Sequence, residues 1–209
     1  MKEKLSNNTW ALLPVWGICL FVLLYIVATF FYPGGSDVDK ATAGFSWQHN
    51  YWCELMASQA QNGKVNTARH VAITAMFVLA TSLIIFWYQI PRLLNGVKIS
   101  KQIIQCSGIA SMLVMPFMFT GSHDMVMNIA ALLGCIALTG LLTKLFTHKM
   151  YWLFGYGIFC LVLCGINNYV YYTSNFLYWL PVIQKISFIA FLSWFVLVTI
   201  RLLKSKSRI

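Results

Sequence analysis

The sequence predicts an all-α protein: a polytopic membrane protein built as a six-transmembrane-helix bundle, with an amphipathic interfacial helix after the first span. Three observations carry this prediction. The 209-residue chain is 59% hydrophobic and only 10% charged, which is too little polar surface for a soluble domain of this size. Its apolar segments reach the roughly 18 to 20 residues that a helix needs to cross a bilayer. Its positive charges gather in alternate connecting segments.

Six segments are predicted to span the membrane: five are apolar for roughly 18 residues or more, and a sixth is apolar with one charge within it. Each is long enough to cross about 30 Å of hydrocarbon as a helix. No charge run or Pro/Gly-rich linker divides the chain, so residues 1–209 form a single domain. The predicted spans cover residues 10–32, 69–90, 102–121, 124–146, 150–172 and 177–203.

The distribution of positive charge predicts the orientation of the bundle. With a cytoplasmic N-terminus, eleven Lys and Arg residues fall on the cytoplasmic side and four on or near the other side. This split follows the positive-inside rule and places both termini in the cytoplasm of a cell that we expect to be bacterial, with the protein in its inner membrane. The net charge of +10 is then explained by topology and contact with anionic lipid, and no nucleic-acid partner is expected.

Residues 46–62 combine aromatic rings with ionisable groups between the first two spans. Ser46 is suited to cap the start of a helix and Gly63 to end it. At about 100° per residue, Ser46, His49 and Asn50 fall on one polar stripe, and the aromatic residues on the other side. The pattern predicts an amphipathic helix at the outer interface, acting either as a plain interfacial belt or as a lid over a site.

Further polar residues follow at the outer ends of later spans. Arg69 opens the second span, and His123 and Asp124 open the fourth, where Asp124 also suits a helix N-terminus. Asn128 lies one turn further along, and Asn167 is near the outer end of the fifth span. Ser122, His123 and Asp124 are consecutive and therefore do not form a catalytic triad, because adjacent side chains diverge.

Lys185 is the most informative single charge. With Gln184, it lies roughly 8 to 12 Å inside the membrane from the nearby aromatic belt, at 1.5 Å per residue. A lysine at this depth requires a carboxylate or an anionic ligand, and Glu54 and Asp124 are the acids expected near it. The alternative is a lysine that extends its charged end to the outer surface.

Three functions fit these residues. The first is a cofactor-free polar pocket on the extracytoplasmic side that binds a membrane lipid or small amphiphile. The second is a zinc site of His49, His123 and Asp124 or Glu54, whose activated water would make the protein a membrane hydrolase acting on a lipid. The third is a buried ion pair in a protein that associates with a membrane-protein partner. The residues expected in the pocket are Ser46, His49, Glu54, Arg69, His123, Asp124, Asn128, Asn167, Gln184 and Lys185.

Several short motifs also carry a family resemblance. Gly44-Phe45-Ser46 with Glu54-Leu55, His123-Asp124, and Gln184-Lys185-Ile186-Ser187 before Trp194 and Arg201 resemble the domain of unknown function 998 family. The resemblance implies a prokaryotic six-span membrane protein, without implying an activity. Ser122, His123 and Asp124 are also distantly similar to residues of the alkaline ceramidase and adiponectin-receptor hydrolases, which implies zinc chemistry at the membrane.

Overall fold

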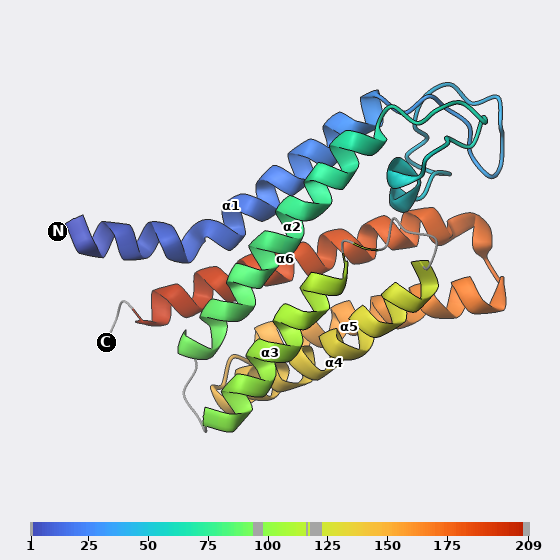
Figure 1. Ribbon diagram of the computed structural model, residues 1–209. Coiled ribbons are helices and arrows are strands. Elements are labelled where there is room, and N and C mark those ends of the chain that lie inside the picture. Colours follow the sequence, from blue (N-terminus) through green and yellow to red (C-terminus); the bar gives the residue numbers. More distant parts are fainter. Residues whose placement is uncertain (1, 94–97, 116, 118–122, 207–209) are drawn as a thin grey trace.

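The computed structural model describes residues 2–93, 98–115, 117 and 123–206, and Figure 1 shows six long helices. Two short 3-10 helices, η1 and η3, precede α2 and α6, and no strand is formed within the described ranges. The predicted all-α class is confirmed. The elements are α1 (Lys2–Phe30), η1 (Trp52–Met56), α2 (Arg69–Leu93), α3 (Lys98–Val114), α4 (His123–Thr147), α5 (Tyr151–Thr173), η3 (Leu177–Trp179) and α6 (Leu180–Lys206).

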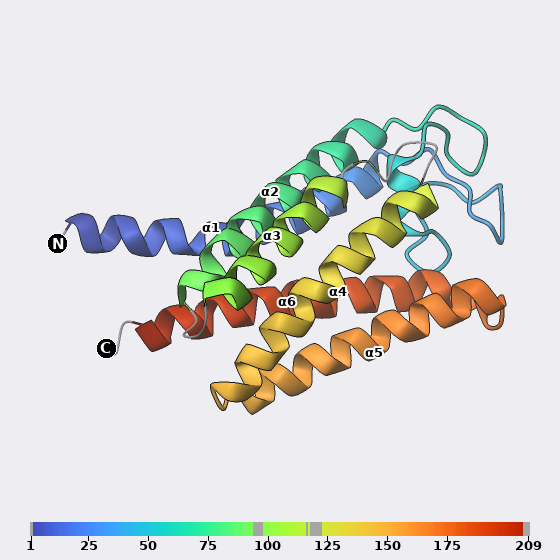
Figure 2. The ribbon, with the colours of Figure 1, turned by 60° about the horizontal axis from the view of Figure 1, so that its bottom comes forward.

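The helices pack as neighbouring pairs. α1 lies along α2, α3 along α4 and α5 along α6, while α2 also contacts α3, and α1 contacts α6. Both ends of the chain lie at one end of the bundle, and the loops of residues 31–68, which we call the cap, lie at the other (Figure 1). Figure 2 shows α4 and α5 diverging from the turn that joins them, and these two helices accordingly make few contacts.

Five of the helices are long and apolar enough to cross a membrane. They cover Trp10–Phe30, Arg69–Ile90, Met125–Thr147, Tyr151–Thr173 and Leu177–Lys204. The third predicted span, residues 102–121, corresponds to α3, which has 17 residues and so rises only about 26 Å along its axis. Residues 118–121 of that prediction lie outside the described ranges. Six helices are therefore observed, and the sixth membrane crossing stays a prediction.

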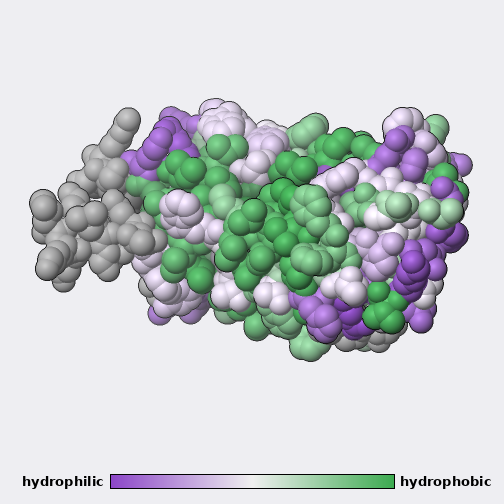
Figure 3. Space-filling view, turned by 90° about the horizontal axis from the view of Figure 1, so that it is seen from above, coloured by the Kyte–Doolittle hydropathy of each residue, from purple (hydrophilic) through white to green (hydrophobic). Residues whose placement is uncertain are grey.

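The surface of the bundle matches a membrane environment. Large apolar side chains such as Phe30, Leu132 and Phe159 are exposed, and apolar residues dominate the middle of the face seen in Figure 3, between polar residues at its two ends. Exposed apolar surface on this scale would make a soluble protein aggregate. Bulky side chains such as Phe21, Trp87 and Trp194 fill the interior between the helices.

The predicted amphipathic helix over residues 46–62 is wrong. Only η1 is helical there, as a 3-10 turn, and the rest of the segment consists of turns and bends. Ser46 does begin a turn, since its hydroxyl accepts from the His49 N–H at 3.2 Å. The side chain of Asn50 then folds back to accept from the Ser46 N–H at 2.7 Å. Such side-chain bonds satisfy the backbone locally and compete with the helix.

Two glycines hold the halves of the cap together. The Gly35 N–H donates to the Thr42 carbonyl at 2.7 Å, and the Gly34 carbonyl accepts from the Asn62 N–H at 3.2 Å. Both glycines have positive φ, and a Cβ on Gly35 would lie 2.4 Å from the Asn62 nitrogen. Only glycine permits this backbone conformation at so close an approach.

Candidate functional site

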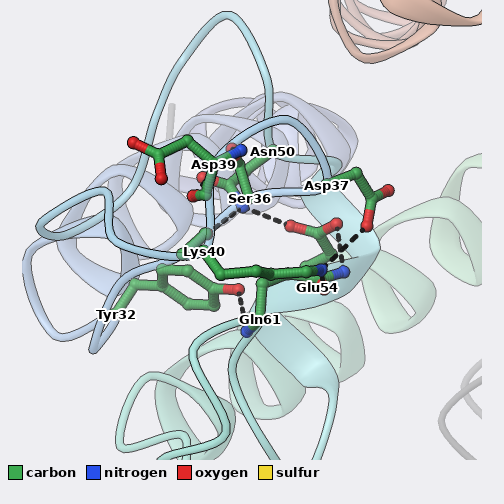
Figure 4. Close-up of polar contacts among 9 residues, drawn as sticks. Tyr32, Ser36, Asp37, Asp39, Lys40, Asn50, Glu54 and Gln61 are labelled. Carbon is green, nitrogen blue, oxygen red and sulfur yellow. Dashed lines mark hydrogen bonds and ion pairs between the residues drawn. The ribbon is translucent and has the colours of Figure 1, made fainter.

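A buried polar network centred on Glu54 links separate segments of the cap to one another. The carboxylate, 8% exposed, accepts from the Gln61 side-chain amide at 2.9 Å and from the Asn50 side-chain amide. Figure 4 shows Glu54 between these two residues, with Lys40 reaching Asp37 and Gln61 at the edge of the cluster. Asn50 and Gln61, from two separate parts of the cap, thus bond to one carboxylate, and Lys40 extends the cluster to Asp37.

Burial raises the pKa of Glu54, because removal from water penalises the charged form. The hydrogen bonds from Asn50 and Gln61 oppose this rise, and of the nearby charges Asp37 raises the pKa further while Lys40 lowers it. Burial therefore outweighs the hydrogen bonds.

Asn50 connects this carboxylate to Lys185 of α6. Its side chain is fully buried and donates to Glu54 and to the Gly35 carbonyl at 2.8 Å. Its backbone carbonyl accepts from the Lys185 ammonium, which also donates to the Pro181 carbonyl at 2.9 Å. The ammonium lies 5.7 Å from the centre of the Phe45 ring, within cation–π range.

The structure therefore brings Glu54 and Lys185 into one network through Asn50. Within the described part of the chain, the two residues make no direct ion pair. Lys185 is 7% exposed, and its ammonium points to the cap rather than to the surrounding lipid. Glu54 and Lys185 each bond to Asn50, and we call these three residues the Glu54–Asn50–Lys185 network. Its role is to attach the cap to α6.

Asn66 is a second buried amide that the sequence analysis did not identify as important. Its side-chain nitrogen donates to the carbonyls of Glu54 and Ala57, both at 2.9 Å, and of Leu55 at 3.2 Å. It thereby holds the end of η1 against the start of α2. An isolated asparagine before an apolar run indicates a helix cap, and nothing in the sequence points to its contacts with η1.

The remaining predicted pocket residues are dispersed. His49 is bonded through Nε2 to the Tyr178 hydroxyl at 3.0 Å and through Nδ1 to the Ser46 hydroxyl at 3.4 Å. Arg69 begins α2 and is half-buried, and Asn128 is exposed on α4. The side chains of His123 and Asp124 lie outside the described residues.

The zinc site stays a prediction. Among the side chains that the structure describes, no three His, Cys, Asp or Glu residues are grouped so that they could hold a metal ion. Two of the predicted ligands have described side chains: His49 contacts Tyr178 and Ser46, and Glu54 accepts from Asn50 and Gln61.

A cavity of about 340 Å³ lies beneath the cap, between η1 and helices α1 to α6. Its lining is mostly aromatic and sulfur-containing, with Trp87, Phe188 and Phe195 on its walls together with five methionines. Two predicted site residues, Asn167 and Gln184, also line it. The volume is at the lower end of the roughly 300 to 1,000 Å³ typical of small-molecule sites.

The cap closes one end of this cavity. The Trp52 N–H donates to the side-chain oxygen of Gln184 at 3.0 Å, which fixes η1 to α6, and the Trp52 ring packs edge-on against Phe188 with centroids 5.3 Å apart. Cys53 lines the cavity beside it, and burial raises the pKa of its thiol to about 11. The thiol is therefore protonated at neutral pH and is a poor nucleophile.

Part of the cavity wall is exposed on α4 and α5. Three lining residues are exposed: Met127 and Ala131 on α4, and Cys164 on α5. These two helices diverge from their connecting turn (Figure 2). The exposed lining residues thus belong to the two helices that make few contacts with each other.

Comparison with known proteins identifies no relative of this chain. No protein-family model, curated protein or solved structure matches the chain, so the resemblance to the domain of unknown function 998 family, and the more distant one to the membrane hydrolases, stay predictions.

Proposed function

We propose that this protein binds a lipid or small amphiphile in the central cavity, with the cap on the non-cytoplasmic side of a cell membrane. The observation that carries the proposal is the cavity itself: an apolar space inside the bundle, covered by the cap at one end and with exposed lining residues on α4 and α5. We infer that a ligand enters between these two helices, from the bilayer and not from water, so it must be membrane-soluble.

The chemistry of the walls supports an amphiphile. Methionine and aromatic side chains give an adaptable apolar surface suited to acyl or ring systems. Asn167, Gln184, Ser111 and Ser187 supply polar groups on the same walls. Few and separated polar groups within an apolar lining orient a ligand that is itself mostly apolar.

The charge distribution supports the orientation. Lys98, Lys101, Lys144, Lys149 and Arg201 all belong to the end of the bundle opposite the cap, because they lie at the helix ends remote from it. Under the positive-inside rule that end is cytoplasmic. The cap, which contains Asp37, Asp39 and Glu54, is then on the outer side.

The proposal is tested by extracting the protein, purified in a mild detergent, with organic solvent and quantifying the released amphiphiles by mass spectrometry. We expect a membrane amphiphile in stoichiometric amount. Ala131→Phe, which places a ring at the mouth of the cavity, should reduce its retention about tenfold, equivalent to about 1.4 kcal/mol.

Leu132→Phe is the matched control, because Leu132 is 67% exposed on the same helix and is not among the described residues that line the cavity. It should retain the amphiphile. Equal retention in both variants, or a wild-type protein that carries no amphiphile, would contradict the proposal.

A further inference from the structure

Three side-chain atoms are buried and have no hydrogen-bond partner within the described part of the chain: the indole nitrogens of Trp52 and Trp87 and the side-chain oxygen of Asn167. The residues that carry these atoms all line the central cavity. A buried donor or acceptor without a partner is costly and uncommon in native proteins, so three of them on the residues of one cavity favour a ligand that pairs with them.

Contacts of α6 with α5 and with η1 place Asn167 and Trp52 at the same end of the cavity. The Ser187 hydroxyl lies 3.4 Å from the Leu163 carbonyl, which sets the register of these antiparallel helices. Asn167 is one turn nearer the cap than Leu163, and Gln184 is about one turn nearer than Ser187. Because Gln184 also binds the Trp52 backbone, Asn167 and Trp52 both belong to the cap end of the cavity.

Trp87 lies deeper. Its ring packs against Phe195 at a centroid distance of 5.9 Å, whereas Trp52 packs against Phe188 at 5.3 Å. Seven residues separate the two phenylalanines on α6, a rise of about 10 Å. Trp52, with an unpaired donor, and Asn167, with an unpaired acceptor, therefore lie at the cap end, and Trp87, with a second donor, lies towards the middle of the bundle.

We propose, building on the proposed function, that the ligand is an uncharged lipid with a free hydroxyl group at the cap end and a further oxygen acceptor, such as an acylglycerol. A hydroxyl accepts from the Trp52 indole and donates to the Asn167 oxygen at once. The ester oxygen of an acyl chain accepts from Trp87. A carboxylate offers only acceptors and leaves the Asn167 oxygen unpaired.

The charges around the cavity support an uncharged ligand. None of the described lining residues is Asp, Glu, Lys, Arg or His, so an anionic or cationic group would be desolvated without compensation. The buried charges nearest to it, Glu54 and Lys185, are already bonded to Asn50. The sequence suggested that Lys185 binds an anionic head group, but its ammonium already donates to the Asn50 and Pro181 carbonyls.

The test measures binding of four probes to delipidated protein by native mass spectrometry: monooleoylglycerol, oleate, oleoyl lysophosphatidate and octadecene. We expect monooleoylglycerol to bind at least about tenfold more tightly than either anion and than the hydrocarbon. Trp52→Phe, Trp87→Phe and Asn167→Leu should each weaken it about fivefold, the ratio expected for one net hydrogen bond.

The octadecene probe checks the cavity itself, because its affinity should be unchanged in all three variants if they fold correctly. Trp179→Phe, at a half-exposed tryptophan of η3, is the matched control and should leave every affinity unchanged. Octadecene or an anion binding as tightly as monooleoylglycerol, or monooleoylglycerol affinities unaltered by the three substitutions, would overturn this inference and leave the proposed function standing. Failure of all four probes, octadecene included, to bind wild-type protein would instead overturn the proposed function.

Discussion

Asn50 shows how one asparagine can stabilise two buried charges of opposite sign. Its side-chain nitrogen donates to the Glu54 carboxylate, while its backbone carbonyl accepts from the Lys185 ammonium. An isolated buried charge costs several kcal/mol, and here the side-chain amide bonds to the negative charge and the main-chain carbonyl to the positive one. The sequence predicted that Lys185 needs an acid and named Glu54, but not that a third residue would join them, since every residue carries a backbone carbonyl.

The raised pKa of Glu54 has a consequence for stability. Because the carboxyl's pKa is higher in the folded protein than in the unfolded chain, the folded state binds more protons between these two values. The Glu54 contribution to the free energy of unfolding therefore falls as the pH rises through this window and is recovered as the pH falls. Lowering the pH from about 7 towards about 5 should thus raise the apparent unfolding temperature of wild-type protein in detergent.

Glu54→Gln is the control for that measurement, because the variant keeps an acceptor for Asn50 or Gln61 but does not titrate. Its unfolding temperature should change less over the same pH range. Asp37, Lys40 and the cap histidine His49 are present in both proteins, so the difference between the two curves isolates Glu54. Identical curves would show that burial does not govern this carboxyl.

At the scale of elements, the cap illustrates why the helical prediction failed. The polar stripe of residues 46–62 has helical spacing, but the side-chain amides of Asn50 and Asn62 donate to the Gly35 and Pro33 carbonyls of the preceding loop. Ser46, Asn50 and Asn66 each satisfy local backbone in this way. Periodicity cannot reveal this competition, because the partners are supplied by distant parts of the chain.

Two glycines on α5 provide a test of helix packing. A Cβ on Gly157 would lie 2.5 Å from a methyl carbon of Leu142 on α4 and 2.9 Å from the Trp194 ring on α6, whereas a Cβ on Gly155 would meet nothing within 4 Å. Gly157→Ala should therefore destabilise the protein by about 1 to 3 kcal/mol through overpacking. Gly155→Ala should leave stability unchanged or raise it by up to about 1 kcal/mol.

Both variants are compared by thermal unfolding in the same detergent. Because they place the same side chain on the same helix, intrinsic helix propensity cancels between them. Equal unfolding temperatures would mean that α5 is not packed against α4 and α6 as the structure has it.

For the whole molecule, the distribution of charges predicts its orientation in the membrane, with the cap on the non-cytoplasmic side. Val38, 57% exposed in the cap, and Lys98, exposed at the start of α3, lie at opposite ends of the bundle. In intact cells, Val38→Cys should react with a membrane-impermeant maleimide, and Lys98→Cys should react only after the membrane is permeabilised. Wild-type protein gives the background from the native cysteines, and the reverse pattern of labelling would place the cap in the cytoplasm.

The sequence by itself determined the six helices, their apolar composition, and the placement of most basic residues at one end of the bundle and most acidic residues at the other. In lipid every backbone group must bond within its own segment, so apolar length and composition are enough to specify a helix. Only the tertiary structure decided the form of the cap, the partners of Lys185 and the existence of a cavity. These depend on contacts between residues far apart, such as Asn50 and Lys185, which are 135 positions apart, and on how closely neighbouring helices approach, which no local pattern encodes.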